Sequence, residues 1–252
     1  MQKCSKLHPD KVYTKKKGNA FLEGVSENHQ YLESIDLADC DMVTDVGLAL
    51  LITKCPKLSP DRVTSAAKGD KFLAAIAEHR ADISSIDLTD CYHVTDAGLA
   101  KLMEHCMDLH PDNVISTEKS DKFLSAVAQH HSHLKRIDVS GCPVTDAGLA
   151  KVMEKCLKMH PNDVISFAKG DLFVISVANY HKDVISINLT GCKGITDAGL
   201  GKLMDGCTGL NPTRVVCHPA IRGASFLAAV AKHHKGKPGV RSRVVLPWYS
   251  VE

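Results

Sequence analysis

Long apolar stretches are missing from this 252-residue sequence. No run approaches the roughly 18 apolar residues that a membrane-spanning helix needs, so we expect no transmembrane segment. Met1–Lys6 holds no apolar core, and we therefore expect no secretory signal peptide. An excess of one charge sign is also missing, because 31 lysines and arginines face 29 aspartates and glutamates. The sequence therefore predicts no general attraction to nucleic acids or to anionic membranes.

The ten cysteines are too few for a disulfide scaffold in a chain of this length. No pair has the Cys-x-x-Cys spacing that zinc ligands show. Since a secretion signal is missing, we interpret the cysteines as reduced, mostly buried thiols of a cytoplasmic protein. Cys217 falls outside the regular spacing described below, and we expect it to be the most reactive thiol.

Catalytic signatures are missing as well. The sequence has no Gly-x-Ser-x-Gly, no phosphate-binding loop, no His-Glu-x-x-His and no Gly-x-Gly-x-x-Gly after a strand. We therefore predict a protein that is not an enzyme and that needs neither a cofactor nor a metal. Apolar residues make up 44% and charged residues 24%, which predicts an ordinary folded protein.

What the sequence does contain is a repeat of about 51 residues. The segment LTDCYHVTDAGL, which runs from Leu88 to Leu99, recurs with small changes at three other places. Its cysteines lie 51, 51 and 50 residues apart, at Cys40, Cys91, Cys142 and Cys192. A second landmark of the form His-Pro-Asp-x-Val lies halfway between them, with its prolines at Pro9, Pro60, Pro111, Pro161 and Pro212. Each period therefore consists of a Cys half and a Pro half.

Each half is expected to contain one short strand and one helix. In the Cys half, Ile86–Thr89 alternates apolar and polar residues, as a strand with one buried face does. Thr95 then suits a helix N-cap and Asp96 suits the first turn. In the Pro half, proline precedes the strand and cannot donate to a sheet ladder. We expect a strand of only two or three residues there; the alternative is a sheet that is interrupted at every second turn.

A half of about 25 residues cannot bury its own apolar face, so successive halves must stack. This requirement predicts an α/β solenoid of about ten halves, with short parallel strands on the concave side and helices on the convex side. We expect the solenoid to span residues 1–237, and a capping strand and tail that includes Trp248 to span residues 238–252. Met1–Pro9 aligns with a helix end at Met153–Pro161, which predicts an uncapped N-terminal edge, either of a longer protein or covered by a partner.

The Cys half resembles a known family. Its pattern is Ile-Asp-Leu-x-x-Cys-x-x-Val-Thr-Asp-x-Gly-Leu, and a further cysteine follows at Cys55, Cys106, Cys156 and Cys207. This pattern is similar to the cysteine-containing leucine-rich repeat, and the alternation of two repeat types resembles ribonuclease-inhibitor-like solenoids. The resemblance implies a horseshoe shape, buried strand-end thiols that hydrogen-bond to the turn, and a role in protein recognition. Ubiquitin-ligase adaptors of this kind carry an F-box, which this sequence does not contain.

Histidine is frequent, with 14 copies. Many fall near the end of the Pro-half helix: His29, His79, His130, His131, His181, His233 and His234. Stacked repeats could align them in a column that binds a transition metal or titrates near pH 6.5. Alternatively, they are partly positive side chains that suit a helix C-terminus.

The exposed strand positions form the candidate binding surface. One predicted column across neighbouring strands consists of Lys11, Asp36, Arg62, Asp87, Asn113, Asp138, Asp163, Asn188 and Arg214. A neighbouring column holds Tyr13, Ala38, Thr64, Thr89, Ile115, Ser140, Ile165, Thr190 and Val216. Opposite charges on adjacent strands could simply pair, each pair stabilising the sheet by about 0–1 kcal/mol. The other interpretation is a mixed-charge surface with an apolar strip that binds a protein.

We predict a non-catalytic protein-interaction module that binds a protein partner, not a nucleic acid or a membrane, through its concave face. The low aromatic content, 5%, argues against a tight interface built on aromatic anchors. Two alternatives remain. One is a structural or assembly module that associates through its N-terminal edge, including with a second copy. The other is an inhibitor or sensor that docks on one enzyme.

Overall fold

The computed structural model describes residues 8–12 and 14–233, which belong to two compact units. Unit 1 holds the residues up to Ser132 together with Ile137–Val144. Unit 2 holds His133–Arg136 and the residues from Thr145 onward. Both units are built from the same repeated piece of chain, a short strand followed by a helix of ten residues.

Unit 1 contains five α-helices and five strands within its described residues. The helices are α1 (Asn19–Asn28), α2 (Asp45–Lys54), α3 (Asp70–His79), α4 (Asp96–His105) and α5 (Asp121–His130). The strands are β1 (Ile35–Asp36), β2 (Val63–Thr64), β3 (Ile86–Asp87), β4 (Val114–Ile115) and β5 (Ile137–Asp138). Three 3₁₀ helices begin at the Pro-half prolines: η1 (Pro9–Lys11), η2 (Pro60–Arg62) and η3 (Pro111–Asn113).

Unit 2 continues the same order of elements. Its α-helices are α6 (Asp146–Lys155), α7 (Asp171–Tyr180), α8 (Asp197–Gly206) and α9 (Ala224–His233). Its strands are β6 (Val164–Ile165), β7 (Ile187–Asn188) and β8 (Val215–Val216). The 3₁₀ helices are η4 (Pro161–Asp163), η5 (Pro212–Arg214) and η6 (Pro219–Ile221).

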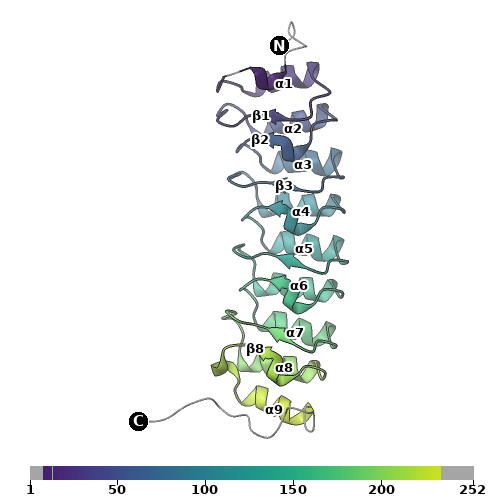
Figure 1. Cartoon of the computed structure of the whole chain (residues 1–252), viewed down its shortest axis with the longest axis vertical. Helices are drawn as coiled ribbons and strands as arrows, with labels where there is room; N and C mark the ends of the chain where they lie inside the picture. Colours follow the sequence, from purple (N-terminus) through teal and green to yellow (C-terminus); the bar gives the residue numbers. More distant parts are fainter. Residues whose placement is uncertain (1–7, 13, 234–252) are drawn as a thin grey trace, which may run out of the picture. The chain divides into compact units, whose positions relative to one another are not determined.

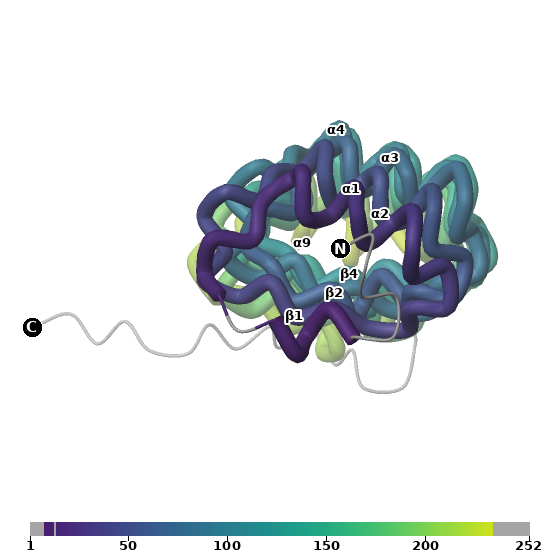
Figure 2. Tube along the Cα trace, turned by 90° about the horizontal axis from the view of Figure 1, so that it is seen from above, coloured from purple at the N-terminus to yellow at the C-terminus, as the bar shows by residue number. Residues whose placement is uncertain are grey.

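Within each unit, the helices line one side of the coil and the strands line the other (Figure 1). A view along the coil shows α1 to α4 of unit 1 on one side and β1, β2 and β4 opposite them (Figure 2). The predicted solenoid of parallel strands and helices is thereby confirmed. None of the described helices is long and apolar enough to cross a membrane.

The core lies between strands and helices, and repeated positions fill it. The largest fully buried side chains include Phe72, Phe123 and Phe173, from the Pro-half helices α3, α5 and α7. The first residue of each strand, such as Ile35 or Val63, is also buried. Because each such residue contacts the next repeat, the core is continuous within a unit.

Helices of the two halves begin in different ways. In the Cys half the predicted cap is confirmed, since the Thr95 hydroxyl accepts a hydrogen bond from Gly98 N at the start of α4. In the Pro half, α3 follows Gly69, which has no side chain to offer. Asp45 supplies the cap from the preceding repeat: its carboxylate accepts from Gly69 N, Lys71 N and Phe72 N at 2.8–2.9 Å.

This cap from one repeat to the next recurs at Asp96, Asp146 and Asp197. It explains why aspartate recurs at the start of the Cys-half helix, where the sequence indicated only a favourable first-turn charge. The glycine two residues later is required by a close approach. A Cβ atom at Gly98 would lie 2.1 Å from Oδ1 of Asp70, the residue that binds Thr95 N and Oγ1.

The strands pair in twos and do not form a continuous sheet. β1 pairs with β2, β3 with β4 and β7 with β8, all in parallel. Beside the other edge of β3 and of β7 lie the 3₁₀ helices η2 and η4. Both possibilities raised by the proline are therefore realised within each unit, because the Pro-half strand has two residues and the sheet stops at every second turn.

Side chains replace the missing ladder bonds at these edges. Asp10 Oδ1 accepts from Asp36 N at 2.9 Å, and Asp112 Oδ1 accepts from Asp138 N at 2.7 Å. In unit 2, Asn162 Oδ1 accepts from Asn188 N at 2.7 Å. The polar residue after the proline thus satisfies a backbone donor that a strand partner would otherwise bind.

Both predicted ends of the solenoid lie largely outside the described residues. This holds for the capping strand and tail at 238–252, for Trp248, and for residues 1–7 at the N-terminal edge. The predicted division into residues 1–237 and 238–252 therefore stays a prediction.

Candidate binding surface

We call the exposed side chains of the strands and of the 3₁₀ helices before them the strand face. Strands place their second residue there, so Asp36, Asp87 and Asn188 are exposed while the residue before each is buried. Most predicted binding residues are exposed in the structure: Lys11, Asp36, Arg62, Asp87, Asn113, Ile115, Asp163, Asn188 and Arg214. Asp138 and Ile165 are half-buried, and Tyr13 lies outside the described residues.

The predicted columns are wrong in register. Asp36 lies opposite Thr64, not opposite Arg62, and Asp87 lies opposite Ile115. The chain advances 28 residues from Ile35 to its partner Val63 and 23 from there to Ile86, whereas the prediction assumed nearly equal steps. The 3₁₀ turn after the proline takes up the extra residues, which places Arg62 before the strand and not on it.

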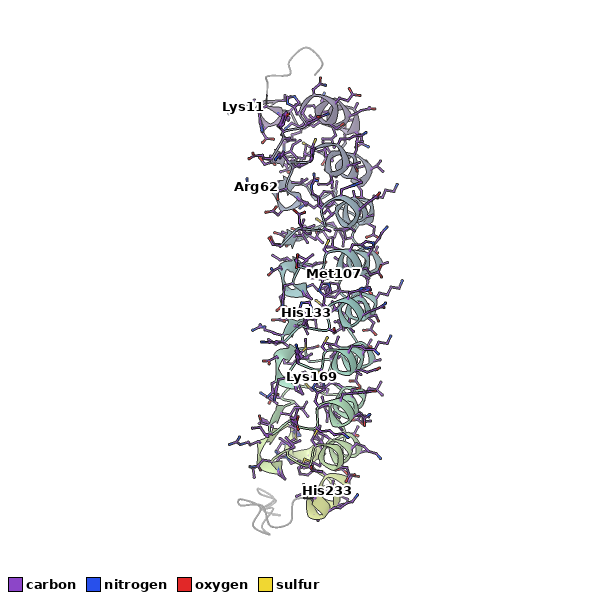
Figure 3. All side chains as sticks on the ribbon, turned by 90° about the vertical axis from the view of Figure 1, so that its right-hand side faces the viewer. Lys11, Arg62, Met107, His133, Lys169 and His233 are labelled. Carbon is purple, nitrogen blue, oxygen red and sulfur yellow. The ribbon has the colours of Figure 1, made fainter. Side chains whose placement is uncertain are left out.

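The ion pairs expected between neighbouring strands are not formed by these described side chains. Neither Lys11 with Asp36 nor Arg62 with Asp87 approaches to ion-pair distance. The Asp36 and Asp87 carboxylates instead accept hydrogen bonds from Ala38 N and Thr89 N, two residues further on. Hydrogen bonds from Thr89 also hold the pKa of Asp87 below its usual range. Lys11 and Arg62 lie on the strand side of unit 1, away from the helices (Figure 3).

Four buried lysines lie beneath the strand face, and the sequence analysis missed them. They are Lys17, Lys68, Lys119 and Lys169, each only 4–7% exposed. Each ammonium lies 5.1–5.9 Å from the ring centre of the phenylalanine four residues later. Each also donates to a main-chain carbonyl at 3.0–3.3 Å. The signal that could have found them is the repeated lysine at a fixed distance before the core phenylalanine.

The surroundings of these buried lysines suit an ammonium group. Burial lowers the pKa of Lys68, Lys119 and Lys169, while nearby cysteines and carboxylates oppose that effect. Lys169 lies between the strands and the helices of unit 2 (Figure 3). The carbonyl and the aromatic ring supply the contacts that a buried ammonium requires.

The strand face of unit 1 contains an acidic hollow of about 350 Å³ above Lys68. Four carboxylates line it: Asp39, Asp61, Asp87 and Asp90. Asp39 and Asp90 have positive φ values, 56° and 58°, at the turn that ends each Cys-half strand. Aspartate tolerates this conformation better than most residues. We call this group the acidic hollow.

The equivalent place in unit 2 is a hollow of about 260 Å³ above Lys169, and no carboxylate lines it. Asn162 and Asn188 replace two of the aspartates, and Gly191 replaces Asp90 at the same positive-φ turn. Ile165 and Phe167 supply an apolar wall, with the Phe167 side chain 71% exposed. We call this group the apolar hollow.

Six of the nine described cysteines are buried and three are half-buried. Cys55, Cys106, Cys156 and Cys207 are fully buried, and burial raises the pKa of the last three to about 11. The strand-end thiols donate to main-chain carbonyls, as Cys91 does to Ser65 O at 3.7 Å. Cys217, predicted to be the most reactive, is half-buried.

Among the described residues, the predicted histidines fall at two neighbouring positions of the repeat, the last helical residue and the C-cap. His131 and His181 cap helix ends of the preceding repeat: their Nε2 atoms bind Met103 O and Met153 O at 2.8 and 2.7 Å. Arg80 occupies the same place earlier in the chain and binds Ile52 O. No group of three or more potential ligands among the described residues could hold a metal ion.

Each unit is a solenoid of strand-turn-helix pieces, and the side chains on its strand face differ from those of the other unit. A family model described as "Leucine Rich repeat" matches three segments, residues 28–51, 130–153 and 182–204. Each matched segment contains the strand and helix of a Cys half. The chain therefore contains leucine-rich repeats at these three segments.

Among solved structures, the chain is similar to a chain of the "Crystal structure of Rad7 and Elc1 complex in yeast". The two are 15% identical, and the match covers 80% of this chain and 79% of that chain, with a TM-score of 0.24. This TM-score is too low to support a shared arrangement of the two chains.

Proposed function

We propose that this protein is a non-catalytic interaction module that binds a protein partner through its strand face. The observation that carries the proposal is the contrast between the acidic and the apolar hollow. The buried lysine and phenylalanine beneath each hollow are the same, while the side chains around it differ in charge and size. Positions that the fold does not constrain are free to determine which partner binds.

The residues that line the two hollows indicate which kinds of side chain the partner carries. Four carboxylates on the strand face of unit 1 favour lysine or arginine side chains of a protein partner. Ile165, Phe167 and Val216 of unit 2 favour an apolar side chain, since Phe167 and Val216 are 71% and 49% exposed. A protein segment offers both kinds of side chain, whereas a small metabolite does not.

The finer family assignment is part of this proposal. The strand-end thiols of Cys91, Cys142 and Cys192 donate to Ser65 O, Ser116 O and Ser166 O, in support of the cysteine-containing subtype. The nine described cysteines are free thiols, which suits the reducing cytoplasm that we propose as the location.

One observation favours the assembly alternative as a second candidate. His29 occupies the place of Arg80, His131 and His181, but its buried Nε2 has no hydrogen-bond partner among the described residues. A carbonyl from another chain at the N-terminal edge could bind it. Light scattering coupled to size exclusion checks this: a monomer at all concentrations contradicts it. The third function, docking on one enzyme as an inhibitor or sensor, would appear as a single enzyme among captured partners.

The strand-face proposal is tested by neutralising the acidic hollow without changing its shape. The variant carries Asp39→Asn, Asp61→Asn and Asp90→Asn, and asparagine tolerates the two positive-φ positions. The matched control carries Glu27→Gln, Glu78→Gln and Glu104→Gln, which remove the same charge from exposed helix positions of unit 1.

Affinity capture with quantification of bound proteins is the measurement. We expect partners recovered by the native chain and by the control to be depleted by the hollow variant. If both variants recover the same partners in the same amounts, the acidic hollow is not the binding site.

A further inference from the structure

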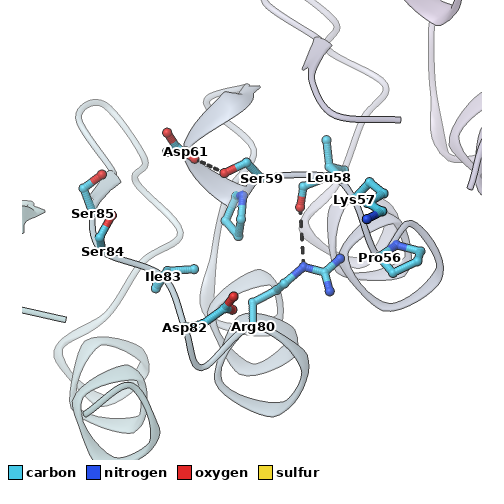
Figure 4. A pocket seen from close by; sticks show the side chains of 11 residues that line it. Pro56, Lys57, Leu58, Ser59, Asp61, Arg80, Asp82, Ile83, Ser84 and Ser85 are labelled. Atoms are coloured by element: carbon cyan, nitrogen blue, oxygen red, sulfur yellow. Dashed lines mark hydrogen bonds between the residues drawn. The ribbon is translucent and has the colours of Figure 1, made fainter. Parts of the chain in front are cut away.

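A second groove lies at the loop edge of each unit; in unit 1 it shares Asp61 with the acidic hollow, whereas in unit 2 it shares no residue with the apolar hollow. In unit 1 it lies between the loop at 56–61 and the loop at 80–85, with a volume of about 270 Å³ (Figure 4). In unit 2 it lies between 157–161 and 180–184, with a volume of about 220 Å³. The two grooves occupy the same place in the repeat, two periods apart, so their linings can be compared directly.

The groove of unit 1 is lined by residues that satisfy one another. The Arg80 guanidinium donates to Leu58 O through Nε and to Ile52 O at 3.1 Å through a terminal nitrogen. Ser59 Oγ donates to Asp61 Oδ1 of the same loop (Figure 4). Pro56 lines this groove where unit 2 has the larger Leu157. Nothing in this lining requires a ligand.

The groove of unit 2 has a different lining. Leu157 takes the position of Pro56 and is 61% exposed, and Tyr180 takes the position of His79 and is 48% exposed. His181 replaces Arg80 and uses its Nε2 on Met153 O. Two large apolar side chains therefore stand in water on either side of this groove.

The charge around this groove is uneven. Lys158 and Lys182 line it and are exposed, and neither forms an ion pair with a described residue. Asp183 is the only acidic residue in the lining, whereas Asp61 and Asp82 balance Lys57 and Arg80 in unit 1. A ligand that offers carboxylates beside an apolar group would complement both features.

We propose that the loop-edge groove of unit 2 binds an acidic segment of a protein partner that inserts an apolar side chain between Leu157 and Tyr180. The carboxylates of that segment pair with Lys158 and Lys182. This surface is separate from the strand face, so it goes beyond the function proposed above. The matching groove of unit 1 does not bind such a segment, because it lacks both the apolar walls and the uncompensated charge.

Fluorescence anisotropy with a labelled peptide tests the proposal on the full chain. The probe is a ten-residue peptide with Leu-Phe at its centre and two glutamates and two aspartates on each side. One reference peptide replaces Leu-Phe with Ser-Ser, and a second replaces every acidic residue with its amide. We expect the probe to bind about fivefold or more tightly than either reference at low salt, and the advantage over the amide peptide to shrink as salt is raised.

Protein variants locate the binding. Leu157→Ser with Tyr180→Ser, and separately Lys158→Ala with Lys182→Ala, should each weaken probe binding about fivefold, because each removes one half of the complementarity. These side chains are exposed, so circular dichroism should show an unchanged fold. The control Lys57→Ala changes the unit 1 groove and should leave binding unchanged.

Two results would overturn the proposal: a probe that binds no more tightly than its references, or one whose binding survives both groove variants. The strand-face variant with Asp39→Asn, Asp61→Asn and Asp90→Asn should bind the probe like the native chain. A failure of the groove proposal can thus be told apart from a failure of the strand-face proposal.

Discussion

The strand faces of the two units lie over the same buried lysine and phenylalanine positions, but their exposed side chains differ in charge and polarity. Asp61, Asp87 and Asp90 in unit 1 correspond to Asn162, Asn188 and Gly191 in unit 2. Beneath them, Lys68 and Lys169 each lie over the ring of the phenylalanine four residues later, although Lys68 donates to Asp87 O and Lys169 to Pro161 O. The comparison shows that the buried residues and the turn geometry are alike in the two units, while the strand-face residues are acidic in unit 1 and apolar in unit 2.

The largest effect on stability is expected from removing the buried phenylalanine that lies at the same core position in both units. Phe72→Ala in unit 1 and Phe173→Ala in unit 2 should each lower the free energy of unfolding by about 3–5 kcal/mol, since both side chains are fully buried. Urea unfolding followed by circular dichroism measures this. Phe21→Ala serves as the control and should cost less, because Phe21 is only half-buried. A large difference between the Phe72 and Phe173 variants would contradict the equivalence of the two interiors.

The caps between repeats should show the next largest effect. Asp96→Ala in unit 1 and Asp146→Ala in unit 2 each remove a carboxylate that accepts three main-chain hydrogen bonds from the following helix. We expect each to lower the free energy of unfolding by about 2 kcal/mol. Asp108→Ala, at an exposed loop position, should change it by less than about 0.5 kcal/mol. Equal losses in all three variants would mean that the caps contribute nothing specific.

Low pH should weaken the helix-end cap of unit 2, which is His181, but not the equivalent cap of unit 1, which is Arg80. Burial lowers the pKa of His181 from its usual 6.5, so the unfolded chain binds a proton there more readily than the folded chain. The stability contributed by neutral His181 is therefore complete above about pH 6.5 and declines as the pH falls below it. Arg80, at the same place in unit 1, stays charged throughout.

The measurement is urea unfolding of the native chain and of His181→Gln at pH 7.5 and pH 5.0. Glutamine can still donate to Met153 O but does not titrate, so the native chain should lose more stability between the two pH values than the variant does. The same loss in both would show that His181 has no part in the acid response.

The smallest effect on stability is expected from giving the hollow of unit 2 the residues that line the hollow of unit 1. Introducing Asn162→Asp, Asn188→Asp and Phe167→Ala gives unit 2 residues that unit 1 carries at these places. The free energy of unfolding should change by less than about 0.5–1 kcal/mol, because all three side chains are exposed. Thermal and urea unfolding measure it. A loss well beyond this range would show that the surface chemistry serves the fold and not recognition.

Much of the fold could be predicted because the sequence signals for each helix and strand recur in every repeat. Thr95 and Asp96 mark the start of α4 correctly, and α2, α6 and α8 begin at the equivalent aspartates. The alternation of buried and exposed residues at Ile86–Asp87 identified β3. Local signals of this kind survive because the same short-range chemistry acts in every repeat.

The candidate surface was predicted less well, because it depends on how separate segments align. The 28- and 23-residue steps between strands follow from the 3₁₀ turn after each proline, and no local pattern reveals them. The buried position of Lys68 was missed because lysine is normally exposed, and only the ring of Phe72 and the carbonyl of Asp87 make burial acceptable. The cap from Asp45 to α3 was missed for the same reason, since it joins two repeats.

The division of the sheet into pairs has a consequence for solubility. A long row of parallel strands would end in unsatisfied donors and acceptors that recruit other extended chains and seed fibres. Here the main-chain N–H of Asp36, Asp138 and Asn188 is instead bound by Asp10, Asp112 and Asn162. Because side chains of the same chain bind these edge N–H groups, each added repeat of this kind brings its own protection against pairing with other extended chains.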